Sequence, residues 1–263
     1  MRAASFATLC QLDAKLEKAG HYGLTPFWRE TAGKLYLHPT ARTLVARVGR
    51  GGAKSFTSAK FGVNEVLAGE WDVPLGERHY FAFVSRLKDE VSHRRLILES
   101  FLRAVGVPFD TAGDEIALRE LPLGFRFFAC SVASASGFRC IGYVADEVAK
   151  WESTDGYKNP AAEVIASLSA MCITHPQARQ FLVSSPWSTD DHHAERFDRG
   201  DTRAQVTAWA PSWIANPSIT EQQTRDLEPD ERIWSREYAA EPGVAVSSAF
   251  DPEDVAACFR SAA

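Results

Sequence analysis

The chain has 263 residues, of which 45% are hydrophobic and 24% are charged, and its formal net charge is −5. This length is near the upper size of a single hydrophobic core, so we expect one large domain with small additions. The negative charge excludes a general attraction to nucleic acid, and a DNA or RNA partner would need a local basic patch. The five cysteines lack C-x-x-C spacing, which argues against a disulfide framework or a zinc site and fits a reducing compartment.

Residues 1–40 are expected to form a helical segment ahead of the core. Apolar residues recur at helical spacing from Phe6 to Leu16, and charged residues interrupt this stretch, which argues against a signal peptide. No window of the sequence is apolar enough to span a bilayer. We therefore expect a soluble, intracellular protein with no membrane partner.

Residues 41–210 alternate short β-like runs with helical patterns. The β-like runs are TLVARVG (43–49), HYFAFVS (79–85), CIGYVAD (140–146), QFLVSS (180–185) and AQVTAW (204–209). This alternation is typical of an α/β fold with a mostly parallel central sheet flanked by helices. Turn residues at 122–124 separate two further apolar runs, so an antiparallel hairpin is expected over residues 115–132.

Residues 211–263 are expected to form short helices joined by polar turns. Thr220 and Gln223 form a capping box, and Asp251 followed by Pro252 predicts another helix start. We interpret this part as a wrap or linker around the core.

The stretch ARVGRGGAKSFTSAK, residues 46–60, nearly matches a phosphate-binding loop. The usual pattern G-x-x-x-x-G-K-[ST] has glycine where this chain has Val48 and Ala53. The context fits, because a β-like run leads into the glycines and a helical pattern follows. Ala53 adds one methyl group, which we expect the loop to tolerate if its φ is negative. On its own, the stretch is equally consistent with an ordinary strand-to-helix turn that carries a surface lysine.

If the loop binds a nucleotide, its backbone N–H groups and the following helix N-terminus would cradle the phosphates. Lys54 would contact the β- and γ-phosphates, and Ser55 would reach Mg²⁺. The residues expected to bind ATP here are Gly49, Arg50, Gly51, Gly52, Ala53, Lys54 and Ser55.

The run CIGYVADEVAKW supplies carboxylates at the end of an expected buried strand. Asp146 would face the crevice where parallel sheets bind ligands and would hold Mg²⁺ through its water shell. Glu147 would polarise the attacking water. The alternative is that Asp146 caps the next helix and Glu147 lies on its first turn. The order of loop and acidic pair favours catalysis.

Two hydroxyl groups, those of Ser184 and Ser185, stand at the end of the next β-like run, QFLVSSPW. Such groups can sense the γ-phosphate or its attacking water. Taken alone, they are better explained as residues that simply end a strand.

With these three elements in this order, the chain resembles the N-terminal ATPase domain of bacteriophage large terminase subunits, the motors that pump DNA into capsids. GRGGAKS places Arg50 where the family's deviant Walker A has an arginine. IGYVADE ends in the Asp-Glu of its Walker B, and SSPW is similar to its coupling motif. Further similarity in HYFAFVSRLKDEVSHRRL, AWAPSWIANPSIT and WSREYAAEPG extends over nearly the whole chain.

The resemblance implies a P-loop NTPase of the additional-strand, catalytic-glutamate (ASCE, RecA-like) type. In that family Arg50 would contact the γ-phosphate, and Ser184 and Ser185 would couple its loss to movement. Arg139 would serve as a trans finger on the ATP of a neighbouring subunit, or it is a surface residue at a strand edge. The adenine would stack on one of three aromatic residues, with Arg29 assisting, unless these aromatics belong to the core; they are Tyr22, Phe27 and Trp28.

The function implied is Mg²⁺-dependent ATP hydrolysis that drives double-stranded DNA into a procapsid in the host cytoplasm. The implied partners are double-stranded DNA, the portal protein, a small terminase subunit and further copies of this chain in a ring on the portal, with a weakly active monomer in solution. We expect an isolated motor domain or a split product without nuclease activity. Two alternatives stay open, a nucleic-acid-remodelling P-loop ATPase and a nucleotide-binding scaffold with little turnover.

Two further clusters call for interpretation. Residues 190–193, DDHH, favour a solvated loop or helix start over a metal site, since adjacent side chains rarely converge on one ion. The basic group that includes Arg94 and Arg95 favours a solvated helix face over a DNA track.

Overall fold

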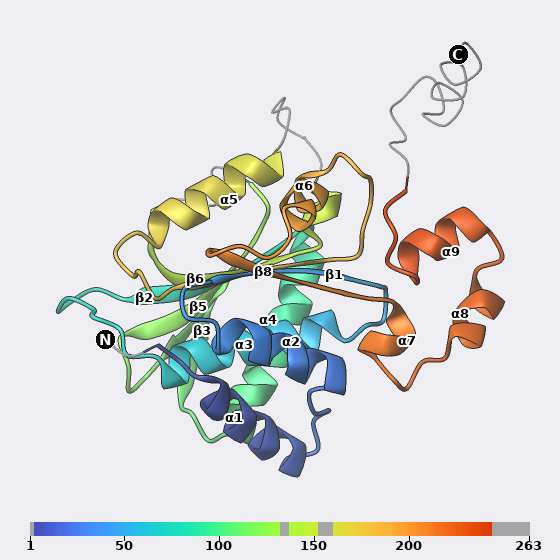
Figure 1. The fold of residues 1–263 in the computed structure, drawn as a ribbon. Coiled ribbons are helices and arrows are strands. Elements are labelled where there is room, and N and C mark those ends of the chain that lie inside the picture. The colour runs from blue at the N-terminus through green and yellow to red at the C-terminus, as the bar shows by residue number, and fades with distance from the viewer. Residues whose placement is uncertain (1–2, 132–136, 152–159, 244–263) are drawn as a thin grey trace.

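The computed structural model describes residues 3–131, 137–151 and 160–243, and these residues form a layered α/β structure around one sheet (Figure 1). The strands are β1 (Thr43–Val48), β2 (His79–Ser85), β3 (Phe109–Ala112), β4 (Glu115–Leu118), β5 (Leu123–Ala129), β6 (Arg139–Asp146), β7 (Arg179–Ser184) and β8 (Gln205–Ala210). Their order in the sheet is β3-β4-β5-β2-β6-β7-β1-β8. From β5 to β8 all neighbouring strands are parallel, as the sequence predicts.

The helices lie in two layers, with α1 to α4 on one face of the sheet and α5 and α6 on the other (Figure 1). The helices are α1 (Phe6–Lys18), α2 (Pro26–Tyr36), α3 (Lys54–Ala68), α4 (Lys88–Ala104), α5 (Pro160–Met171), α6 (His192–Asp198), α7 (Ser212–Ala215), α8 (Glu221–Leu227) and α9 (Glu231–Glu237), with a 3-10 turn η1 (Val148–Lys150). In the described residues, no helix has the length and apolar character that crossing a membrane requires.

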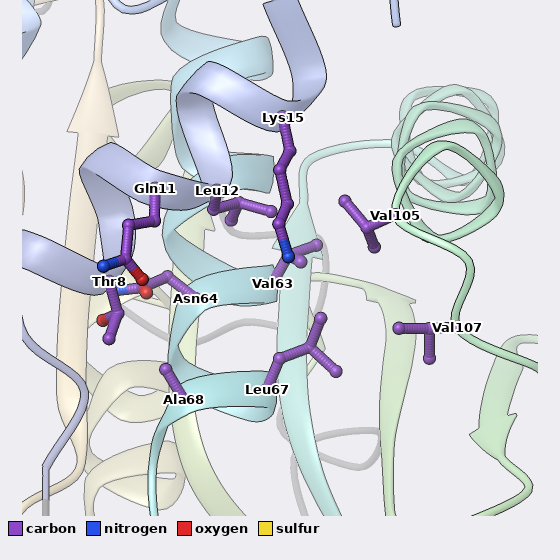
Figure 2. A pocket seen from close by; sticks show the side chains of 10 residues that line it. All are labelled: Thr8, Gln11, Leu12, Lys15, Val63, Asn64, Leu67, Ala68, Val105 and Val107. Atoms are coloured by element: carbon purple, nitrogen blue, oxygen red, sulfur yellow. The ribbon is translucent and has the colours of Figure 1, made fainter. Parts of the chain in front are cut away.

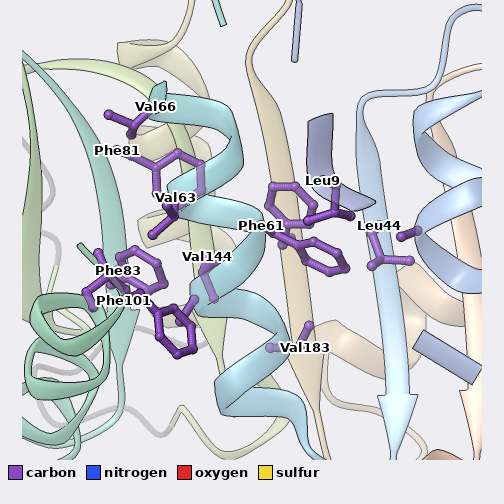
Figure 3. Packing of buried hydrophobic residues seen from close by; sticks show 14 of the residues in the cluster. Leu9, Leu44, Phe61, Val63, Val66, Phe81, Phe83, Phe101, Val144 and Val183 are labelled. Carbon is purple, nitrogen blue, oxygen red and sulfur yellow. The ribbon is translucent and has the colours of Figure 1, made fainter. Parts of the chain in front are cut away.

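Alternation along β2 shows how the sequence builds both layers. Phe81 and Phe83 belong to the core beneath α3 and α4, whereas Ala82 and Val84 belong to the core beneath α5. Figure 3 shows Phe81 and Phe83 on one side of α3 and Phe61 on the other, all in the first of these cores. Full burial of one such aromatic side chain is worth roughly 1.5–3 kcal/mol, so this layer fixes α3 firmly against the sheet.

The hairpin predicted over residues 115–132 is present as the antiparallel pair β4 and β5, and its residues beyond 131 lie outside the described part. The structure adds β3, which pairs antiparallel with β4 across a turn at Gly113 with φ of +55°. The sequence analysis missed β3 because it is short and mostly exposed, so it shows no alternation of apolar residues.

Strand order decides which strand ends meet. β7 lies between β1 and β6, which is the additional-strand arrangement expected from the resemblance. Arg47 of β1 is in register with Ser184 of β7, and Asp146 of β6 is in register with Val183. The carboxyl ends of these three parallel strands therefore lie at one edge of the sheet, where open α/β sheets bind their ligands.

The chain on both sides of the 41–210 segment packs against it. The α1 and α2 side chains Leu9, Leu16 and Trp28 are fully buried in the core shared with α3. After β8, the helices α7 to α9 lie beside the carboxyl end of β1 (Figure 1). The capping box at Thr220 starts α8, as predicted. The helix predicted from Asp251 lies outside the described residues.

Candidate functional site

The loop between β1 and α3 turns sharply through left-handed backbone. Gly51 has φ of +76°, and Ala53, the residue before α3, has φ of +60°. The condition under which the loop is expected to tolerate Ala53, a negative φ, is therefore not met. The left-handed conformation brings Cβ too close to the following carbonyl oxygen, at about 1–2 kcal/mol for a residue other than glycine. The backbone at Ala53 is therefore strained, because alanine stands where the usual pattern has glycine.

Two other glycines are required because neighbouring atoms approach closely. A Cβ on Gly49 would lie 2.4 Å from the carbonyl oxygen of Tyr238 and 2.5 Å from Oγ of Ser212. A Cβ on Gly52 would lie 2.5 Å from Cγ1 of Val48 and 2.9 Å from the oxygen of Gly49. The C-terminal segment thus presses directly on the loop.

Side chains from distant parts of the chain hold the loop carbonyls. Nε1 of Trp28 donates to the oxygen of Gly52 at 2.7 Å, Oγ of Ser212 donates to that of Arg50 at 2.6 Å, and Nδ2 of Asn216 donates to that of Gly51 at 3.0 Å. Across a trans peptide the N–H points opposite to the carbonyl. The N–H groups of Gly51 and Ala53, which follow two of these carbonyls, therefore face away from the donors, as an anion cradle requires. The N–H of Gly52 already donates to the carbonyl oxygen of Gly49 at 3.1 Å.

The contact made by Trp28 shows whether this residue is available to stack on the adenine base. Its ring is fully buried and its N–H is committed to the loop, so Trp28 belongs to the core, which is the second of the two alternatives given for these aromatics. Tyr22 is 81% exposed. Phe27 is partly buried, packs edge-on against Trp28 at 5.1 Å and stays a prediction as an adenine contact. Arg29 is paired with Asp13 at 3.0 Å, which ties α2 to α1.

Lys54 joins the loop to the acidic end of β6. Its buried ammonium donates to the carbonyl oxygens of Val48 at 3.0 Å and Gly49 at 3.2 Å. It also lies 3.4 Å from Oε1 of Glu147. Ser55, the next residue, stands half-buried in the first turn of α3. The lysine therefore bends back over its own loop and reaches both halves of the site.

Glu147 is charge-balanced by two lysines. It follows β6 with φ of +53°, and its Oε2 accepts a hydrogen bond from Oγ of Ser185 at 2.9 Å and lies 3.5 Å from Nζ of Lys150. Burial alone would raise the pKa of Glu147, but Lys54, Lys150 and the Ser185 hydroxyl lower it to about 2. The side chain is therefore ionised at neutral pH.

Asp146 is almost fully buried and does not cap the next turn, where Glu147 precedes η1 without a side-chain cap bond. Both Nε (2.7 Å) and Nη2 of Arg94 in α4 donate to Oδ2 of Asp146. Oδ1 is buried and has no hydrogen-bond partner. Burial raises the pKa of this carboxyl group, and Arg94 opposes that rise. A buried carboxylate oxygen without a partner, with a helix-start hydroxyl on Ser55, fits the oxygen ligands that Mg²⁺ prefers.

The two serines at the end of β7 differ in their contacts. Oγ of Ser184 accepts from the N–H of Ala149 at 3.2 Å and donates to the carbonyl oxygen of Ser185 at 2.7 Å. Oγ of Ser185 donates to Glu147 and accepts from Nζ of Lys150 at 2.9 Å. Ser185 therefore contacts Glu147 directly, and Ser184 holds the turn η1 through the N–H of Ala149.

The two arginines expected to act on phosphate lie in different places. Nε of Arg50 is 3.0 Å from Oε2 of Glu237 at the end of α9, and the Arg50 side chain is 65% exposed. The same Glu237 oxygen is 3.5 Å from Nζ of Lys150. Arg139 is exposed at the first residue of β6, and Asp146 is the last. At about 3.3 Å per residue these ends are roughly 23 Å apart, so Arg139 cannot reach the site of its own chain.

The DDHH segment forms a helix start, as one of its interpretations predicts. Asp191 caps α6 by accepting from the N–H of Ala194 at 2.8 Å. His193 is buried rather than solvated, and burial, with the nearby Arg47 charge, lowers its pKa to about 3. In the described residues, no group of three or more His, Cys, Asp or Glu side chains could hold a metal ion.

Three charged residues of the site are not predicted from the sequence. Arg94 was interpreted as part of a solvated helix face, whereas it lies against Asp146. Lys150 stands three residues after Glu147, a spacing that places both on one turn and could have indicated the pair. Glu237 lies in WSREYAAEPG with no local signal for its contact with Arg50. Pairings between distant segments are set by the fold, which no local pattern shows.

A separate cavity of about 270 Å³ lies between α1, α3 and the segment after α4. Figure 2 shows Leu12, Lys15 and Asn64 among its lining side chains. It lies toward the C-terminal end of α3, whereas the phosphate-loop residues precede the N-terminal end of that helix. This cavity is therefore not part of the candidate nucleotide site.

Comparison with known proteins identifies the fold. No protein-family model matches the sequence, and no curated protein is significantly similar to it. The structure is similar to the HK97 bacteriophage large terminase, with a TM-score of 0.69 and 11% identity, covering 88% of this chain and 54% of that one. It is similar to the large terminase ATPase domain of Thermus phage P74-26, with a TM-score of 0.65 and 15% identity, covering 92% and 99%.

A third similar structure is the large terminase of another thermophilic bacteriophage in complex with ADP, with a TM-score of 0.58 and 12% identity, covering 89% of this chain and 52% of that one. This chain spans about half the length of the HK97 and ADP-bound proteins and matches nearly all of the P74-26 domain. The chain has the fold of phage large terminase ATPase domains. The family resemblance drawn from the sequence is confirmed at the level of the fold.

Proposed function

We propose that this chain is the ATP-hydrolysing motor domain of a phage large terminase, which drives double-stranded DNA into a procapsid. One observation carries this proposal. Lys54 of the glycine-rich loop and Glu147 at the end of β6 lie 3.4 Å apart at the carboxyl edge of the sheet. The fold supports it, and a protein of similar fold, the large terminase of the second thermophilic phage, is solved with ADP and with ATP-γ-S.

The loop would bind the phosphates of ATP. Gly51 and residues 53–55 would supply backbone N–H groups at a helix start, where anions are favoured. The N–H groups of Gly49, Arg50 and Gly52 instead donate to the oxygens of Ala210, Glu237 and Gly49. Lys54 would exchange its two loop carbonyls for the β- and γ-phosphates. Arg50 would reach the γ-phosphate only by leaving Glu237, which its mostly exposed side chain permits. Phe27 would contact the adenine.

Ser55 and Asp146 would hold Mg²⁺, which supplies positive charge against the triphosphate. Oδ1 of Asp146 is the acceptor that such an ion or its water shell would use, because it is buried without a partner. Oδ2 is already taken by Arg94.

Glu147 would orient the attacking water and accept its proton. With a pKa of about 2 it is ionised but weakly basic while two lysines balance it. When Lys54 turns to the phosphates of ATP, its positive charge is shared with them and stabilises the Glu147 carboxylate less. The pKa of Glu147 then rises, which makes it a better base when ATP is present.

The remaining roles concern the assembled motor. Ser184 and Ser185 would couple loss of the γ-phosphate to movement, with Ser185 in direct contact with Glu147. Arg139 would act as a trans finger on a neighbouring subunit, since it is far from its own site. The partners proposed are double-stranded DNA, the portal protein, a small terminase subunit and further copies of this chain in a ring, at a procapsid in the host cytoplasm.

Phosphate release from Mg²⁺-ATP, measured with and without double-stranded DNA at several protein concentrations, tests this function. We expect specific activity to rise with protein concentration and with DNA, because the trans arginine needs a neighbour. Tight ATP binding with no release under any condition would contradict turnover and favour the scaffold. Strand separation without a capsid would favour a remodelling ATPase.

A further inference from the structure

The ion pair between Arg94 and Asp146 joins a helix outside the recognised motifs to the expected metal-holding carboxylate. Arg94 lies in α4, which follows β2 and packs against α3. The two side chains are 12% and 3% exposed, so the pair is shielded from water. A charged carboxylate at this depth requires a cation or several donors close by.

The guanidinium of Arg94 bonds only one of the two carboxylate oxygens of Asp146. Arginine commonly pairs with a carboxylate through two parallel bonds, one to each oxygen. Here Nε and Nη2 both donate to Oδ2, and Oδ1 is left buried without a partner. A fork that bonded each oxygen would leave neither free for another ligand. This arrangement instead anchors Oδ2 and leaves Oδ1 open.

We propose that Arg94 is a positioning residue for Asp146, which it holds by Oδ2 so that Oδ1 is ready for Mg²⁺ bound with ATP. This inference rests on the proposed function and extends it to α4. Arg94 neutralises the charge of Asp146. The charge of Glu147 is neutralised by other residues, Lys54 and Lys150. Residues that orient a metal-binding side chain typically change metal affinity by about 10–100-fold when altered.

The test is the affinity for the fluorescent analogue MANT-ATP, measured with Mg²⁺ and with EDTA. The ratio of the affinity with Mg²⁺ to the affinity with EDTA is the gain in nucleotide affinity that the metal provides, called the gain below. Measuring it does not require hydrolysis. Arg94→Lys keeps the charge but loses the fork, and we expect this gain to fall by about tenfold while the affinity in EDTA stays as in the wild type. Arg94→Gln should lower the gain further.

The matched control is Arg95→Lys, one position along the same helix. Arg95 pairs with Glu99 at 3.4 Å instead of with Asp146, so its replacement should leave the gain unchanged. Circular dichroism of each variant checks folding, and Arg94→Lys keeps the test valid if Arg94→Gln does not fold.

An unchanged gain in Arg94→Lys would overturn the proposal. A larger gain would also overturn it, because Arg94 would then compete with the metal. The proposed function fails separately if the wild type binds no MANT-ATP, or binds it without any effect of Mg²⁺, and the Arg94 proposal then falls with it. A reduced gain in Arg94→Lys together with a normal gain in Arg95→Lys supports both the proposed function and the positioning role of Arg94.

Discussion

The loop at residues 49–53 and the acidic end of β6 lie at the same edge of the sheet, but different forces hold them. The loop is fixed by close packing and by bonds to its carbonyl oxygens from Trp28, Ser212 and Asn216. The acidic end is fixed by ion pairs, in which Arg94 balances one carboxylate and two lysines balance the other.

This difference predicts how each half responds to change. A loop held by packing is sensitive to the volume of a single methyl group, and far less to charge. A buried cluster of ion pairs, in which Lys150 also lies 3.5 Å from Glu237, is sensitive to any charge brought in or removed, because burial strengthens each interaction. Binding of a triphosphate with its metal would therefore rearrange the acidic end much more than the loop.

The largest expected effect concerns Glu147→Gln, which removes charge from the acidic end. Loss of a general base typically lowers turnover by about 10²–10⁴-fold, and nucleotide binding should remain because the loop is untouched. Lys54→Ala should instead abolish binding. Phosphate release and MANT-ATP titration separate the two results. Lys34→Ala, which removes an exposed lysine paired with Asp201, is the matched control. Normal turnover in Glu147→Gln would show that another group activates the water.

Gly49→Ala tests the packing of the loop. Its Cβ would collide with the backbone oxygen of Tyr238, and we expect a loss of about 2–3 kcal/mol in the free energy of unfolding, measured by urea denaturation. Gly33→Ala is the control, because the nearest side-chain atom to its Cβ would be at an ordinary 3.7 Å and the site is helical. That variant should be neutral or slightly stabilising. Equal stability in the two variants would mean that the C-terminal segment does not press on the loop.

His193 should make stability depend on pH. Its pKa is about 3 in the folded protein, against about 6.5 when unfolded. The unfolded chain therefore binds one more proton between these values, and the stabilising contribution present above pH 6.5 is lost as pH falls. In His193→Asn the slope of unfolding free energy against pH should shrink by about 1.4 kcal/mol per pH unit between pH 6 and pH 4. Exposed His93→Asn should keep the wild-type slope.

Ala53→Gly should give the smallest effect. Glycine removes the strain of φ at +60° but adds freedom to the unfolded chain, so we expect a net gain of about 0.5–1 kcal/mol in stability. Thermal unfolding measures it. A loss of stability would indicate that the Ala53 methyl group makes packing contacts worth more than the strain.

The sequence predicted those features that local patterns encode. The five β-like runs correspond to strands within one residue at each end, because their apolar content and the turn residues around them are local signals. The convergence of Lys54 and Glu147 could be expected from strand ends alone. The left-handed conformation of Ala53 could not, because alanine disfavours it. Contacts between segments far apart in the chain leave no local pattern. For this reason, the contact of Arg94 with Asp146 and that of Trp28 with the Gly52 oxygen could not be predicted.

The most direct test of the central claim is a crystal structure of this chain with Mg²⁺ and ATP-γ-S. We expect the triphosphate on the N–H groups of Gly51 and residues 53–55, with Lys54 turned from its loop carbonyls to the phosphates. We also expect Oδ1 of Asp146 directed to the metal and Glu147 facing the γ-phosphate. Nucleotide bound elsewhere, or Asp146 and Glu147 turned away from the γ-phosphate, would contradict this claim.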